Sequence, residues 1–177
     1  MSQNQISRTN SYLTFRIDNE IYAANVSKIL SILELTKITK LPRTPEYIRG
    51  VINLRGTVLP IVDLRTKFSL SPTEFTSNTC ILVLEIIVES TEVKVGALVD
   101  SVLEVLEIKD EEIVAPPRIG NNLNTDFIEG MFKSDDTFTM ILNLDLIFSA
   151  DELTLMSSDL VKQKAEEIPE VQNEENK

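Results

Sequence analysis

The feature of this sequence that most restricts its fold is an internal duplication. Residues 47–51 match residues 127–131, and residues 29–35 match residues 102–108, in the same order along the chain. A third set of spaced residues recurs eighty positions later, since Thr57, Ile61, Leu64 and Phe68 are matched by Thr137, Ile141, Leu144 and Phe148. Three ordered matches make chance a poor explanation, so the sequence predicts two copies of one small unit.

Each copy is predicted to contain about five short strands. Apolar and polar residues alternate in 13–17, whereas 80–88 is almost continuously apolar, and both patterns are typical of strands. Arg55-Gly56 joins two apolar runs, and the glycine supplies the positive φ of a tight hairpin. A unit of about 65 residues is too small for a comfortable core, so the copies should share an apolar layer. A groove along their junction is the expected binding surface.

The predicted fold class is therefore all-β with short helices. We expect two five-stranded β-barrel subdomains, about 11–70 and about 78–150, within a single domain over 11–150. Asn25 and Asp63 are placed to cap short helical turns.

The two ends of the chain lie outside this predicted domain. The spacing of Ser149 and Glu152 is that of a capping box, and apolar residues three and four apart follow it. This pattern predicts an amphipathic C-terminal helix over 151–165. Residues 1–10 are expected to be a flexible N-terminus, and the glutamate-rich segment 166–177 a mobile acidic tail.

The composition argues against several classes of function. A formal net charge of −11 argues against nucleic acid or an anionic membrane surface as the main partner. The chain has no His, which removes imidazole acid–base chemistry and most zinc sites. Cys80 is the only cysteine and lies in an apolar run too short to span a membrane, as expected of a core thiol in a reducing cytosol. We expect no enzymatic activity, no cofactor and no metal.

The stretch 44–65, TPEYIRGVINLRGTVLPIVDLR, resembles the signature of the CheW family, the coupling proteins of bacterial chemotaxis. The similarity extends from about Ser11 to about Asp159. It implies a non-catalytic adaptor built from two small β-barrel subdomains. It also implies two partners, the regulatory domain of the histidine kinase CheA and the cytoplasmic tip of methyl-accepting chemoreceptors. We expect a cytoplasmic protein, monomeric when isolated, that is recruited to receptor arrays at the inner face of the membrane.

The resemblance assigns site residues one position at a time. Receptor binding is implied for the Arg-Gly turn and for positions beside the groove between subdomains: Arg55, Gly56, Thr79, Cys80, Val95, Gly96, Val99 and Val102. Kinase contact is implied for Ile29, Ile38 and Gly50. A ring-closing contact of the second subdomain with a further kinase is implied for Val114, Arg118 and Ile119. Independently of the resemblance, a guanidinium at a tight turn between apolar strands suits a partner's carboxylate or carbonyl.

One position departs from the family's pattern. The family often has an acidic, receptor-engaging residue where this chain has Ser31. The repeat equivalent of Ser31 is Glu104, which belongs to a different surface. Either the receptor of this protein lacks the matching cation, or the affinity for the receptor depends on Arg55 and the apolar groove.

Other functions stay open at this point. An adaptor of a different chemosensory system, such as one that controls surface motility, would differ only in its kinase partner. A protein of the CheV type carries a receiver domain after the adaptor, for which 177 residues leave no room. An enzyme that uses Lys or carboxylates would need a pocket with perturbed pKa values. A nucleic-acid-binding barrel would need a basic groove with exposed aromatic side chains.

Overall fold

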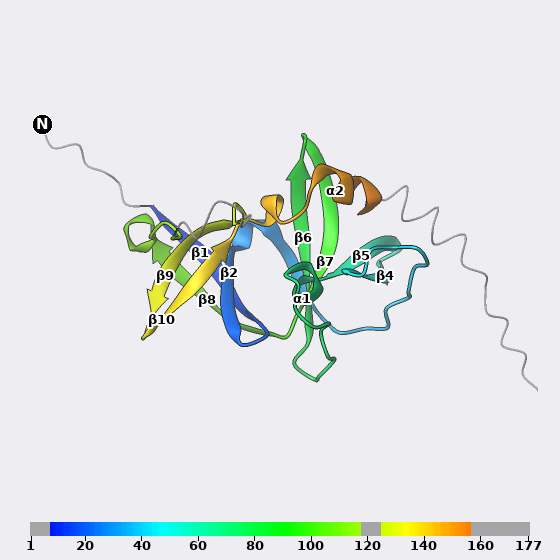
Figure 1. Cartoon of the computed structure of the whole chain (residues 1–177), viewed down its shortest axis with the longest axis horizontal. Helices are drawn as coiled ribbons and strands as arrows, with labels where there is room; N and C mark the ends of the chain where they lie inside the picture. The colour runs from blue at the N-terminus through cyan, green and yellow to red at the C-terminus, as the bar shows by residue number, and fades with distance from the viewer. Residues whose placement is uncertain (1–7, 118–124, 157–177) are drawn as a thin grey trace, which may run out of the picture.

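The chain folds into two five-stranded sheets with a few short helices. The computed structural model describes residues 8–117 and 125–156. Sheet A has the strand order β8-β1-β2-β10-β9, and sheet B has the order β3-β6-β7-β5-β4 (Figure 1). The strands are β1 Thr9–Ile17, β2 Glu20–Asn25, β3 Ile29–Glu34, β4 Ile48–Leu54, β5 Thr57–Asp63, β6 Cys80–Val88, β7 Thr91–Val99, β8 Ser101–Lys109, β9 Ile128–Ser134 and β10 Thr137–Leu142. The helices are η1 Val26–Lys28, α1 Leu64–Lys67, η2 Asp110–Glu112, η3 Leu144–Leu146 and α2 Ala150–Met156.

The predicted duplication is present in the topology. β3, β4 and β5 in sheet B correspond to β8, β9 and β10 in sheet A, and each set ends on a parallel pair, β5 with β7 or β10 with β2. The fourth and fifth strands of sheet B follow in sequence as β6 and β7. Those of sheet A are instead the N-terminal hairpin, β1 and β2. The predicted division into 11–70 and 78–150 therefore does not match sheet membership, because the first hairpin pairs with strands from the end of the chain.

Local details repeat with the strands. The Asp63 amide donates to the Tyr47 carbonyl, and eighty residues later the Asn143 amide donates to the Phe127 carbonyl, each at 2.7 Å. The side chain of Asp63 caps α1, and that of Asn143 caps η3. The cap predicted at Asn25 is also present, at η1. These local predictions are confirmed.

The predicted closure of each subdomain into a barrel is wrong. β3 and β4 form opposite edges of sheet B, joined only by the isolated bridge between Thr39 and Val51. The edges of sheet A, β8 and β9, are likewise linked only through the bridge between Val114 and Met131. Prolines follow each bridge segment, at 42 and 45 and at 116 and 117, and a proline cannot donate to a ladder.

The two sheets share one apolar core, as predicted. The cluster takes side chains from both sheets, including Phe15 from sheet A and Val95 from sheet B, both fully buried. Aromatic rings cross the junction, with Phe68 stacked on Phe127 at 5.4 Å between ring centroids. Smaller clusters lie within sheet B, around Ile61, and within sheet A, around Ile141. Each sheet therefore packs one face against its partner and encloses a smaller core on the other.

The ends of the chain agree only partly with expectation. Thr9 and Asn10 pair with β8, so the flexible N-terminus predicted over 1–10 is wrong for these two residues. Ser149 and Glu152 form the predicted capping box at the start of α2, which the structure describes as far as Met156. The rest of the predicted helix, the acidic tail 166–177 and residues 1–7 lie outside the described residues.

Candidate functional site

The Arg55-Gly56 turn joins β4 and β5 in sheet B. Arg55 has φ 52° and Gly56 has φ 81°, the pair of positive values that a tight hairpin turn between twisted strands requires. The Gly56 amide donates to the Asn53 side chain at 2.8 Å. Arg55 and Gly56 are both exposed, so the turn presents a guanidinium on a fixed support.

A groove of about 390 Å³ adjoins this turn. We call it the Arg55 groove, and its lining residues come from β3, from the β4–β5 hairpin, from β6 and from β7: Leu30, Ser31, Leu33, Leu54, Arg55, Thr57, Leu59, Val83 and Lys94. Leu59 and Val83 are buried members of the core of sheet B, whereas the Leu30 side chain is 47% exposed. The groove is therefore an opening onto an apolar core, with polar and charged residues at its border.

The charge at this border is entirely positive. Arg55 and Lys94 both line the groove, and none of its described lining residues is a carboxylate. Ser31 also lines it, so the departure from the family's acidic residue falls within the groove. Our reading of the sequence did not single out Lys94. The available signal was a cation in an apolar strand, in phase with Gly96 and Leu98 and hence on their face of the sheet.

A second groove of about 510 Å³ lies where β3 and β6 approach the start of β8. We call it the junction groove, and its lining residues are Glu34, Leu35, Thr76, Ser77, Asn78, Thr79, Cys80, Ser101 and Val102. Three of the predicted receptor positions, Thr79, Cys80 and Val102, are thus brought together here. The Cys80 thiol is half-buried and donates to the Asn78 carbonyl at 3.3 Å.

Three other predicted receptor positions lie inside the protein. Val95 and Val99 are 0% and 1% exposed and belong to the core shared by the two sheets. Gly96 is buried, and a Cβ atom there would lie 2.5 Å from the Ile61 side chain. These residues form the framework behind the grooves and are not at the surface.

The positions expected to contact the kinase do not form one patch. Ile38 and Gly50 are neighbours, because a Cβ atom on Gly50 would lie 2.9 Å from Ile38 Cγ2. Ile29 opens β3 and packs against the shared core. Of the ring-closing positions, Val114 is 49% exposed beside β9, and Arg118 and Ile119 lie outside the described residues.

The described residues contain neither a metal-binding cluster nor a membrane-spanning helix. Within 8–117 and 125–156, no three His, Cys, Asp or Glu side chains are grouped as they would be to hold a metal ion. Over the same ranges no helix is both long and apolar enough to cross a membrane.

Comparison with known proteins decides the family. The model of the CheW-like domain matches residues 11–152. The chain belongs to the CheW family. It is similar to the probable chemotaxis protein CheW of Rhizobium etli, with 34% identity over 140 residues that cover 79% of this chain and 88% of that protein. It is 33% identical to the chemotaxis protein CheW of Helicobacter pylori, over 79% of this chain and 82% of the relative.

A solved structure of the family has the same fold. The scaffolding protein TtCheW from Thermoanaerobacter tengcongensis superimposes with a TM-score of 0.71 and 30% identity, covering 86% of this chain and 96% of that one. CheW proteins are non-catalytic scaffolds, and this protein is likewise not an enzyme. It is an adaptor that couples chemoreceptors to the histidine kinase CheA in bacterial chemotaxis.

Proposed function

We propose that this CheW protein binds its two partners through separate surfaces, both formed mainly by sheet B. The cytoplasmic tip of a methyl-accepting chemoreceptor docks as a helix against the Arg55 groove and the junction groove, with Arg55, Gly56, Cys80 and Val102 at the contact. Thr79, which is only 3% exposed, supports the junction groove from within. The buried residues Val95, Gly96 and Val99 support these contacts from behind. The observation that carries this proposal is an apolar opening beside a rigid, exposed guanidinium, which suits an amphipathic helix.

The regulatory domain of CheA binds to the other part of sheet B. Ile38 and Gly50 form the centre of this contact, and Ile29 contributes from the start of β3, where it packs against the shared core. Two observations support this assignment. Ile38 and Gly50 are neighbours at the edge strand β4, and the Arg55 turn lies at the other end of that strand. A contact of Val114, Arg118 and Ile119 with a second kinase would close rings, and the exposed Val114 side chain beside edge strand β9 favours it.

The proposed setting is the cytoplasm, at receptor arrays on the inner face of the membrane, with the isolated protein a monomer. Exposed edge strands and apolar openings of this kind are the features that partner chains cover. Sedimentation of the purified protein over a range of concentrations tests the monomeric state, and a concentration-dependent dimer would contradict it.

Calorimetric titration with the CheA regulatory domain of the same organism tests the central proposal. We expect a Kd in the micromolar range or tighter, about −8 kcal/mol or better. Arg55→Glu should leave this contact intact and weaken binding of a chemoreceptor cytoplasmic fragment, whereas Ile38→Arg should do the reverse. A folded protein that does not bind the regulatory domain would contradict the kinase contact, and kinases of other chemosensory systems would then be titrated.

A further inference from the structure

The Arg55 groove has a second cation, Lys94. It comes from strand β7, whereas Arg55 lies in the turn between β4 and β5. Along β7 the side chains of Lys94, Gly96 and Leu98 point to the same face of the sheet, because side chains alternate along a strand. Leu98 belongs to the same apolar cluster as the groove residues Leu59 and Val83. Lys94 therefore lies on the face that encloses the core of sheet B, at its open end.

Neither cation forms an ion pair with a carboxylate of the described residues, although Glu85 faces Lys94 across the β6–β7 ladder on the same side of the sheet. Glu85 lies two residues beyond the groove residue Val83 on β6. By contrast, the described ranges hold ion pairs for four other cations, Lys28, Arg49, Arg65 and Lys67. The groove thus holds two unpaired positive charges beside an apolar floor.

The equivalent end of sheet A has the opposite charge. By the repeat, Ser31 corresponds to Glu104 and Arg55 to Asp135. Ile61 pairs with Gly96 in sheet B, and Ile141 pairs with Ala23 in sheet A, so Lys94 corresponds to Ile21. Glu85 corresponds by the same ladders to Arg16, which reverses sign as well. The fold therefore does not require cations at the positions of Arg55 and Lys94, because sheet A has Asp135 and Ile21 there and carries its cation, Arg16, on the neighbouring strand.

We propose that Lys94 determines partner specificity in this protein, by selecting, together with Arg55, a helix that presents a carboxylate beside an apolar side chain. The apolar side chain enters the groove over Leu59 and Val83. The carboxylate is held between the guanidinium and the ammonium group, and Ser31 leaves that position without a competing charge. This inference rests on the proposed receptor contact, and it adds that the receptor residue at this contact is acidic.

Charge reversal at Lys94 tests the inference. The purified full-length protein is titrated with a cytoplasmic fragment of a chemoreceptor from the same organism. Lys94→Glu should weaken binding at least about tenfold, and Lys94→Gln should weaken it less, since it removes the attraction without adding repulsion. Raising NaCl from about 50 mM to about 300 mM should weaken the wild-type complex more than the Lys94→Glu complex. Lys133→Glu, an exposed charge reversal on β9, is the matched control and should have little effect.

A compensating change identifies the partner carboxylate. Each glutamate and aspartate on the exposed face of the fragment's helices is changed singly to lysine. One such change should restore binding to Lys94→Glu while it weakens binding to the wild-type protein. Equal affinity of Lys94→Glu and wild type, or equal loss with Lys133→Glu, would overturn the role of Lys94.

Binding of the CheA regulatory domain separates the two possible failures. Lys94→Glu should bind this domain with wild-type affinity, which shows that the variant is folded. If the wild-type protein bound the kinase domain but no receptor fragment, the proposed receptor contact would be wrong, and the inference would fail with it. If the fragment bound all variants equally, only the inference would fail.

Discussion

Sheets A and B are two copies of one design, and their differences show which parts of the design are fixed. The strand order, the parallel pair and a side-chain helix cap after it are common to both, although the cap is Asp63 in one copy and Asn143 in the other. The buried side chains that pack between the strands differ, since Gly96 in sheet B corresponds to Ala23 in sheet A. Ile61, Ile81 and Leu59 crowd Gly96, and in the other copy Thr139 takes the place of Leu59. The framework is therefore conserved between copies, while volume has been redistributed between facing strands.

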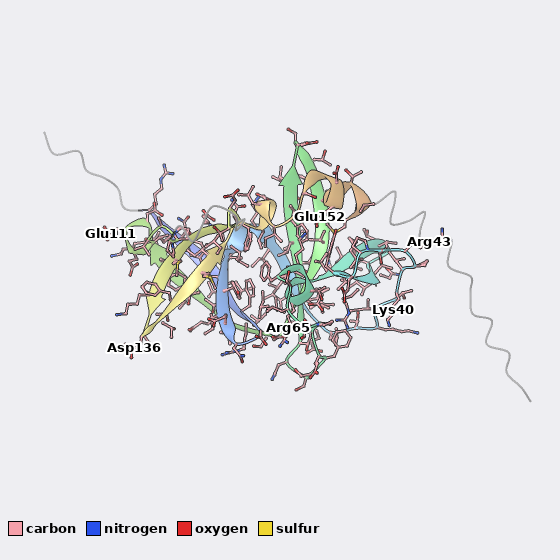
Figure 2. The ribbon with its side chains drawn as sticks, viewed as in Figure 1. Lys40, Arg43, Arg65, Glu111, Asp136 and Glu152 are labelled. Carbon is pink, nitrogen blue, oxygen red and sulfur yellow. The ribbon has the colours of Figure 1, made fainter. Side chains whose placement is uncertain are left out.

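The ion pairs at the junction of the sheets also occupy equivalent positions in the two copies, but with the positive and negative residues exchanged. Arg65, after β5, holds Asp100 on the crossover from β7 to β8, and Asp100 also accepts from the Asp18 amide at 2.6 Å. Figure 2 shows Arg65 between the two sheets. The repeat equivalent of Arg65 is Asp145, which pairs with Lys28 on the other crossover and accepts from the Ile87 amide at 3.0 Å. Each crossover is fastened by an ion pair, but the signs are exchanged.

The largest difference between the copies is expected at their helix caps. Asp63 is fully buried and accepts from the Arg65 amide, from the Thr73 amide and hydroxyl, and from Arg49 at 2.7 Å. Asp63→Ala should lower the free energy of unfolding by about 4 kcal/mol, because it leaves a guanidinium without its buried partner. Asn143→Ala removes only a cap and should cost about 1 kcal/mol. Urea unfolding measures both, and equal losses would show that the Asp63 network contributes nothing beyond the cap.

The equivalent glycines sharpen the comparison at the edge strands. Gly50 has φ +140°, and a Cβ atom there would lie 2.1 Å from the Thr39 carbonyl oxygen. Gly50→Ala should cost about 3 kcal/mol, through backbone strain and displacement of a bridging strand. Gly130→Ala meets the Ile113 side chain instead, at 2.5 Å, and should cost about 1 kcal/mol, since a side chain yields more readily. Thermal unfolding ranks the two variants, and the opposite ranking would contradict this account.

A smaller difference is expected at the two crossovers. Arg65 donates three hydrogen bonds to the Asp100 carboxylate, two from Nε at 3.0 Å and one from Nη2 at 2.7 Å, and this hydrogen bonding raises the pKa of Arg65. Arg65→Met should cost about 2 kcal/mol. Lys28→Met breaks the single, more exposed contact with Asp145 and should cost less than about 1 kcal/mol. Hydrogen exchange at the amides of Asp18 and Ile87 reports each crossover separately, and faster exchange at both in either variant would contradict their independence.

The smallest effect is a dependence on pH that only one copy should have. Burial and the neighbouring Glu152 carboxylate raise the pKa of Tyr47 from 10.0 to about 12, while its repeat equivalent is the non-titrating Phe127. A raised pKa contributes stability that is complete below about pH 10 and is lost as the pH rises through about 12. Wild-type protein should therefore lose more stability than Tyr47→Phe over this interval. Parallel curves of unfolding free energy against pH would exclude a contribution from Tyr47.

Much of the fold follows from local sequence patterns. The hairpin at Arg55-Gly56 and the caps at Asn25 and Asp63 depend on residues close together in the chain, and all were predicted. The strand β9 had no clear pattern of its own, because Gly130 and polar residues interrupt it, and it follows only from its match to β4. The signature at 44–65 likewise indicated the family without any knowledge of the sheets.

The tertiary structure decided which residues are at the surface and which strands share a sheet. Spacing could not show that β1 and β2 complete the sheet begun by β8, because that pairing joins the two ends of the chain. Nor could a run of apolar residues show that Val95 and Val99 are buried while Leu30 borders a groove, since a strand has two faces and either can be covered. The position of Lys94 in the same groove as Arg55 was also visible only in the tertiary structure. Lys94 meets Arg55 only because β7 and the β4–β5 hairpin open onto one end of sheet B, a proximity that long-range packing creates and sequence distance conceals.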